Sequence, residues 1–132
     1  MTPVELSISE SPIVSASFGS GDWGAELRFL GIVRGTEADA RIAGIIYSAY
    51  LPMAQQVLEN IAREMQQAHG PHPLQIHHRL GWVPVGEASL VITTAGRHSA
   101  ETLARLEQYL HRIKTELPIW KEFRNQAPEF PQ

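Results

Sequence analysis

Lys114 and Lys121 are the residues whose type and spacing most suggest chemistry, and they lie seven positions apart in the segment KTELPIWKEF. Pro118 falls between them and ends a helical pattern, so the two side chains can converge from a helix end and the loop that follows. A lysine partly buried beside Trp120 would lose solvation, and the resulting fall in its pKa would let it act as an acid, a base or a nucleophile. From spacing alone, the alternative is a pair of solvated surface lysines.

Other polar residues could bind an anion. Arg97, His98 and Ser99 lie where a predicted strand leads into a helix, and the unpaired N–H groups and positive dipole of a helix start favour negative charge. The alternative is that Ser99 is only an N-cap between solvated side chains. Arg34 follows an apolar strand and begins a glycine-containing loop, which is a common functional position, although a lone arginine there is usually surface.

His77 and His78 form a polar run with Arg79 on a predicted strand, where consecutive side chains point to opposite sides. No further metal ligands stand at a suitable spacing, so exposed or hydrogen-bonded histidines are expected here and a protein-bound metal is not. The chain has no cysteine, which removes disulfides, thiolate metal sites and cysteine nucleophiles from consideration.

The elements that must position these residues follow from hydrophobic periodicity. Apolar runs predict strands over residues 4–8, 25–33 (mostly buried towards its end), 42–50, 74–80 and 88–94. Helices are predicted from about residue 52 to 68 and from 99 to 117. The apolar stripes of these helices are Met53, Val57, Ile61 and Met65 on the first and Leu103, Leu106, Leu110, Ile113 and Leu117 on the second.

The remaining segments connect these elements. Residues 11–17 are predicted to form a helical turn, 35–41 a polar loop and 84–86 a break in a strand, and the tail from Asn125 is expected to be irregular. Two helices against a mainly antiparallel sheet is the economical arrangement for this order of elements. The predicted fold class is therefore α+β, in a single domain of residues 1–132.

Composition excludes several classes of function. Hydrophobic residues make up 43% of the 132 residues and charged residues 19%, which are globular values. The formal net charge of −3 argues against bulk electrostatic binding to nucleic acid or to an anionic membrane. The N-terminal segment does not look like a signal peptide, and no apolar run is long enough for a membrane span, so a cytoplasmic protein is expected.

Three segments together resemble the large, catalytic subunit of molybdopterin synthase. They are GAELRFLGIVRG at 24–35, HRLGWVPVGE at 78–87 and KTELPIWKEF at 114–123, and Tyr50 and Met53 fit the family's Y-x-x-M helix entry. The resemblance runs from residue 24 to 122, about three-quarters of the chain. Each motif is weak alone, but their order and spacing and the K-x-x-x-P-[IF]-W-K segment make the set specific.

The resemblance implies an α/β-hammerhead-like fold and a sulfurtransferase of molybdenum cofactor biosynthesis. In this family a small ubiquitin-like subunit carries a C-terminal Gly-Gly thiocarboxylate, which supplies sulfur to cyclic pyranopterin monophosphate and so forms the dithiolene of molybdopterin. Large subunits form a homodimer within a heterotetramer, and each pocket includes residues from the neighbouring subunit. No cofactor of the protein itself is implied, and neither nucleic acid nor a membrane is an expected partner.

The resemblance also implies roles for individual residues. Lys114 matches the lysine at the end of the donor tail, where it would orient the thiocarboxylate and take part in proton transfer or in a transient adduct with the donor carbonyl. Lys121 matches the second lysine, which would bind substrate and stabilise developing negative charge. Arg34 would contact the phosphate or the pterin. The remaining predicted substrate-binding residues are Phe29, Arg97, His98, Ser99 and Glu122.

Some positions depart from the family pattern. Ser99 stands where the family has an arginine, with Arg97 on the other side of His98, and Glu37 stands where an amide is usual. Two hypotheses follow besides a chance match in an unrelated α+β domain. One is an active synthase subunit. The other is a divergent, non-catalytic paralogue that keeps the dimer and binds a Gly-Gly-tailed partner or an anionic ligand.

Overall fold

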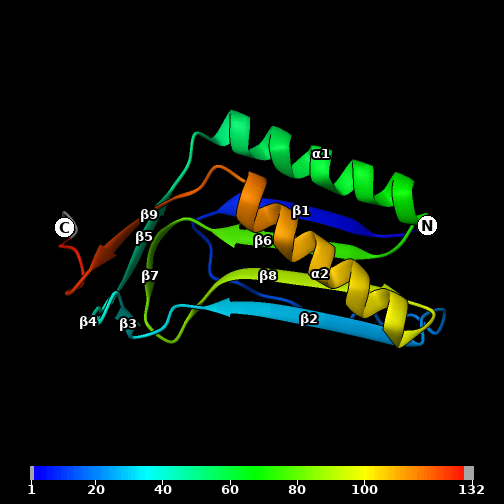
Figure 1. Cartoon of the computed structure of the whole chain (residues 1–132), viewed down its shortest axis with the longest axis horizontal. Helices are drawn as coiled ribbons and strands as arrows, with labels where there is room; N and C mark the ends of the chain where they lie inside the picture. Colours follow the sequence, from blue (N-terminus) through cyan, green and yellow to red (C-terminus); the bar gives the residue numbers. More distant parts are fainter. Residues whose placement is uncertain (1, 130–132) are drawn as a thin grey trace.

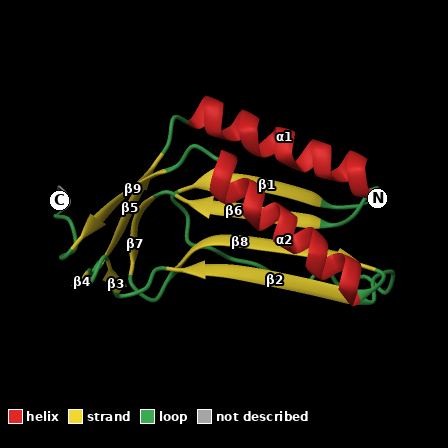
Figure 2. Ribbon diagram, viewed as in Figure 1, coloured by secondary structure: helices red, strands yellow, loops and turns green. Residues whose placement is uncertain are grey.

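A four-stranded sheet with two helices against it forms the larger part of the molecule (Figures 1 and 2). The computed structural model describes residues 2–129. The strands of this sheet lie in the order β1 (Val4–Ser9), β6 (Leu74–Arg79), β8 (Ala88–Gly96) and β2 (Ala25–Ile32). β1 pairs with β6 in parallel and the other pairs are antiparallel. Helix α1 (Leu51–His69) contacts β1, and helix α2 (Ser99–Glu116) contacts β8 and β2.

A smaller antiparallel sheet lies beyond one end of the larger one (Figure 1). Its strands lie in the order β7 (Gly81–Pro84), β5 (Gly44–Ser48) and β9 (Trp120–Arg124). A hairpin of β3 (Thr36–Glu37) and β4 (Ala40–Arg41) precedes β5. The α+β fold class predicted from the sequence is confirmed.

The structure corrects several local predictions. Residues 11–17 form no helical turn. Residues 35–41 are not a plain loop but contain the β3–β4 hairpin, whose two turn residues, Ala38 and Asp39, have positive φ angles. The break predicted at 84–86 follows a separate strand, β7, which Gly81 starts with φ 78° as the chain leaves β6 for the second sheet. The segment after Pro118 is strand β9 and not a loop.

The buried faces also differ from the predicted stripes. On α1 the buried residues are Ala54, Leu58, Ile61, Ala62 and Met65, whereas Met53 is 51% exposed. On α2 Leu103 is 56% exposed, and the buried residues are Thr102, Arg105, Tyr109 and Ile113. Leu30 and Ile32 are exposed at the end of β2, so this strand alternates instead of becoming buried, because it is an edge strand covered on one face.

The buried polar residues of α2 are hydrogen-bonded, which is why they can replace leucines in the core. Tyr109 Oη lies 2.6 Å from His72 Nε2, and His72 Nδ1 lies 2.7 Å from the backbone oxygen of Gly70. Since a carbonyl oxygen only accepts, Nδ1 donates there and Nε2 accepts from the Tyr109 hydroxyl. Arg105 Nη2 donates to the backbone oxygen of Ala95. The contact with Ala95 fastens α2 to β8, and the contact with His72 fastens it to the connection between α1 and β6.

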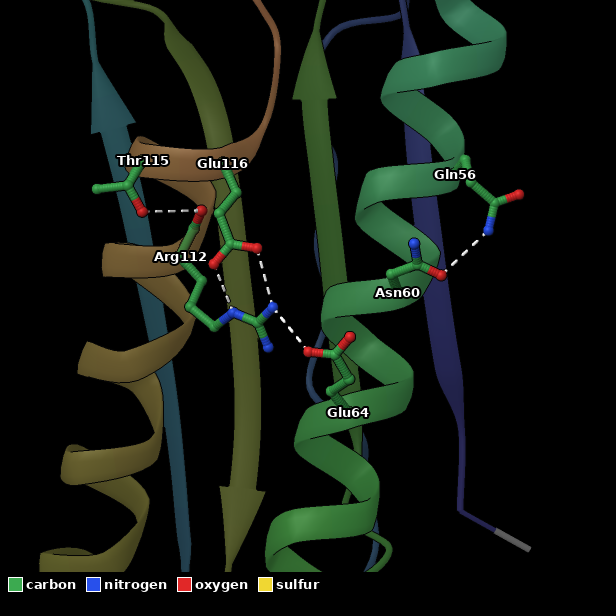
Figure 3. Close-up of polar contacts among 6 residues, drawn as sticks. All are labelled: Gln56, Asn60, Glu64, Arg112, Thr115 and Glu116. Carbon is green, nitrogen blue, oxygen red and sulfur yellow. Dashed lines mark hydrogen bonds and ion pairs between the residues drawn. The ribbon is translucent and has the colours of Figure 1, made fainter.

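Arg112 links the two helices (Figure 3). Its Nη2 lies 2.9 Å from Glu64 Oε1 on α1, and its Nε lies 2.7 Å from Glu116 Oε2 one turn further along α2. The hydrogen bond to Glu116 is the main reason that the pKa of Arg112 is raised. The last turn of α2 is therefore held against α1. Within residues 2–129, no helix combines the length and the apolar character that crossing a membrane requires.

Candidate active site

A cleft of about 590 Å³ lies where the end of α2, the small sheet and the end of β2 meet. Apolar residues form part of its wall, with Ile45, Ile113, Leu117 and Ile119 among them. Its polar and charged side chains are Arg34, Glu37, Tyr47, His78, Ser89, Lys114 and Lys121. Residues from distant parts of the sequence thus converge on one space.

Lys114 and Lys121 both line this cleft, and they are the only lysines in the chain. Lys114 lies in the last turn of α2, and Lys121 is the second residue of β9, where it pairs with Tyr47 of β5. Pro118 lies in the short turn that joins the helix to the strand. The predicted convergence of the two lysines is therefore present in the fold, while their roles in chemistry stay a prediction.

The burial predicted for a lysine beside Trp120 is not found. Trp120 is 69% exposed, and both lysines belong to the exposed residues of the chain. Trp120 and Lys121 are consecutive on β9, and consecutive strand residues point to opposite faces. The indole is therefore directed away from the cleft that Lys121 lines.

Arg34 and Phe29 reach the same cleft from the end of β2. The Arg34 side chain is 78% exposed, and its Nε lies 3.2 Å from Glu37 Oε1 in the β3–β4 hairpin. Glu37, the residue that departs from the family pattern, thus occupies one side of a guanidinium that could otherwise bind a ligand anion. The cleft carries three cationic groups and one carboxylate.

The other predicted site residues do not line this cleft. Arg97, His98 and Ser99 are exposed at the start of α2, and fifteen residues of helix place Ser99 roughly 22 Å from Lys114. The N-cap is His98 and not Ser99, and Glu101 Oε1 accepts a hydrogen bond from the His98 backbone N–H. Their part in substrate binding stays a prediction, and it requires a neighbouring copy of the chain.

Glu122 also lies outside the residues that line the cleft. It is the neighbour of Lys121 on β9, so its side chain points to the other face of the strand. There Glu122 Oε1 lies 3.1 Å from Arg124 Nη2, in an ion pair between two half-exposed side chains.

Three polar cleft residues were missing from the predicted site: Tyr47, His78 and Ser89. Burial raises the pKa of the Tyr47 hydroxyl, a hydrogen bond with Ser89 lowers it and the charge of Glu37 raises it. Tyr47 could have been found only by knowing that β5 pairs with β9, because nothing in the local sequence marks it. His78 stood in a recognised motif, but its spacing suggested only a strand histidine.

The molecule is thus an α+β protein in which two helices cover a mixed sheet and a cationic cleft opens between that sheet and a smaller one. The same fold occurs in the molybdopterin synthase of Staphylococcus aureus, with a TM-score of 0.82 and 26% identity over 97% of this chain and 95% of that one. Subunits 1 and 2 of the molybdopterin-converting factor of Helicobacter pylori form a protein–protein complex that matches with a TM-score of 0.65 and 26% identity, over 77% of this chain and 66% of that one.

Sequence comparison identifies the family. The model described as "MoaE protein" matches residues 3–116, and the chain belongs to the MoaE protein family. It is 34% identical to the molybdopterin synthase catalytic subunit of Rattus norvegicus over 121 residues, which is 92% of this chain and 59% of that protein. The human catalytic subunit is 33% identical over 92% of this chain and 63% of that protein. The chain thus spans about three-fifths of the length of these mammalian relatives. The family that the sequence motifs resembled is confirmed.

Proposed function

We propose that this chain is the catalytic subunit of a molybdopterin synthase. In this proposal, it transfers sulfur from the C-terminal thiocarboxylate of a small ubiquitin-like subunit to cyclic pyranopterin monophosphate and forms the dithiolene. The observation that carries the proposal is that the only two lysines of a MoaE family chain reach one cleft together with Arg34.

The cleft has the chemistry that this reaction needs. The sulfur donor and the phosphorylated pterin are both anions, and fixed cations lower the cost of bringing them together and of developing further negative charge. In our proposal Lys114 orients the thiocarboxylate, Lys121 binds the substrate and Arg34 contacts its phosphate.

The assembly is proposed as two large subunits, each with one small partner. The Helicobacter pylori relative was solved as a complex of two different subunits, which supports a small protein partner. A Gly-Gly tail is narrow enough to enter a cleft of this size. Arg97 and His98 lie too far from Lys114 of the same chain to share its cleft. In the proposed dimer, the start of α2 from one large subunit would bring these two residues to the cleft of the other.

A mixing assay tests the proposed function. The purified chain is combined with a thiocarboxylated small subunit that ends in Gly-Gly and with cyclic pyranopterin monophosphate, and dithiolene product is measured. Product is expected only when all three are present. A chain that binds the thiocarboxylated partner but forms no product would instead be the non-catalytic paralogue, a reading favoured by the Arg34–Glu37 ion pair and by Ser99.

Removing the carboxylate of Glu37 is expected to improve substrate binding. In Glu37→Gln the negative charge beside Arg34 is lost, so the guanidinium is free to contact the phosphate and one repulsive charge disappears from the cleft. At the dielectric constant of water, a unit charge about 4 to 10 Å from the phosphate is worth about 0.4 to 1 kcal/mol, so this change lowers the KM for the pterin roughly twofold to fivefold. Steady-state kinetics would measure it, with Glu107→Gln on the exposed face of α2 as control. An unchanged or higher KM in Glu37→Gln would contradict the role given to the ion pair.

A further inference from the structure

His78 lies in the wall of the cleft, although nothing proposed above uses it. Its side chain is 7% exposed. The imidazole packs edge-on against the Tyr47 ring, with centroids 5.1 Å apart and ring planes at 72°. Tyr47 in turn pairs with Lys121 across β5 and β9. The orientation of the His78 ring is therefore fixed next to a lysine that the proposed reaction needs.

One hydrogen bond determines which nitrogen of His78 carries the proton. Nδ1 lies 2.9 Å from the backbone oxygen of Arg79, and because a carbonyl oxygen can only accept, Nδ1 must donate. Burial lowers the pKa of His78 to about 4; the contact with Arg79 opposes this shift and the charge of Lys121 adds to it. The ring is therefore neutral near pH 7, with its hydrogen on Nδ1 and a free lone pair on Nε2.

The Nε2 lone pair is available to a ligand. Nε2 makes no hydrogen bond to another residue in the described part of the chain. Nε2 is also accessible. Among residues 2–129, the only side-chain nitrogen and oxygen atoms that lack both a hydrogen-bond partner and contact with solvent are Arg79 Nε and Arg105 Nε, so the unpartnered Nε2 of His78 must be in contact with solvent. Beside three cationic donors, His78 thus presents a neutral group that can accept a hydrogen bond but cannot donate one.

We propose that His78 determines specificity by accepting, at Nε2, a hydrogen bond from a ring N–H of the bound heterocycle. This inference rests on the proposed function, in which the substrate is a phosphorylated pterin. The phosphate is satisfied by cations, but the N–H donors of a pterin ring need acceptors, which lysine and arginine cannot provide. His78 therefore recognises the heterocycle, and the cationic side chains recognise the charge.

Calorimetric titration of the intact chain tests the proposal with two ligands. One is cyclic pyranopterin monophosphate and the other is phenyl phosphate, which has an anionic group but no ring N–H. In His78→Leu the Kd for the pterin is expected to rise about fivefold to tenfold, the loss of one neutral hydrogen bond, while the Kd for phenyl phosphate is unchanged. His78→Gln, whose amide oxygen lies near the position of Nε2, is expected to recover part of the affinity.

His78→Asn serves as the matched control. Its amide can replace Nδ1 as donor to Arg79 but is too short to reach the position of Nε2, so it should bind pterin as weakly as His78→Leu. Wild-type affinity for the pterin in His78→Leu or His78→Asn would overturn the role of His78 and leave the proposed function intact. Equal weakening of both ligands, without recovery in His78→Gln, would also overturn it, because that is the signature of a merely structural residue. A wild-type chain that binds no pterin would instead overturn the proposed function.

Discussion

Replacement of Lys114 by alanine is expected to reduce dithiolene formation by a factor on the order of 10² or more. The amine would be lost from the point where the donor tail is proposed to end, together with its charge and its capacity for proton transfer. The fold should persist, because Lys114 is exposed and alanine suits a helix. The measurement is the initial rate of product formation with thiocarboxylated partner, at saturating and at limiting pterin.

Two further measurements, a control variant and a search for lysine adducts, test this prediction. Arg63→Ala removes one exposed cation from α1 and should leave the rate unchanged. Because Lys114 and Lys121 are the only lysines, any adduct on a lysine side chain after reaction with the donor must lie on one of two residues, which mass spectrometry can separate. A normal rate in Lys114→Ala would remove this lysine from the mechanism.

Acidification from pH 7 to pH 5 is expected to destabilise the protein, at pH values above those at which most carboxylates titrate. Burial lowers the pKa of His72 to about 4 and that of His78 to about 4, and it also lowers the pKa of His77. Between these values and the ordinary 6.5 the unfolded chain binds more protons than the folded one, so the free energy of unfolding rises with pH there and falls on acidification. From pH 7 to pH 5 the loss is about 2 kcal/mol for each of His72 and His78.

Urea unfolding at a series of pH values from 5 to 7 would measure this slope. His72→Asn removes one titrating group and is expected to flatten the slope by about one proton, although it also lowers stability at pH 7 by breaking the contact with Tyr109. The control is Leu103→Gln, which replaces an exposed, non-titrating residue of α2 and should leave the slope as in the wild type. If His72→Asn and wild type lose stability in parallel, the buried neutral state of His72 is wrong.

The sequence predicted the long elements of the fold and missed the short ones. Both helices and the strands of the larger sheet have strong periodicity, and their bounds were close to those observed. β7 contains a proline, and β9 follows one, so local signals indicated a break and a loop. Both are edge strands of the small sheet, and they exist because they pair with β5, a tertiary contact that no local pattern reports.

The candidate site shows the same division. Motifs led to Lys114, Lys121 and Arg34 because these positions carry the family resemblance. They did not lead to Tyr47, which reaches the cleft through strand pairing. Nor could a helical stripe of leucines reveal that hydrogen-bonded polar residues fill the core face of α2.

The pairing of β9 with β5 has a consequence for the sign of charge in the cleft. Lys121 faces inward only because it stands opposite Tyr47 in this ladder. A slip of the outer strand by a single residue would exchange its two faces and present either the indole of Trp120 or the carboxylate of Glu122 in place of an ammonium group. The charge that β9 presents to the cleft therefore depends on the register of this strand against β5. Insertions or deletions between Leu117 and Ile119 should abolish activity even where every cleft side chain is retained.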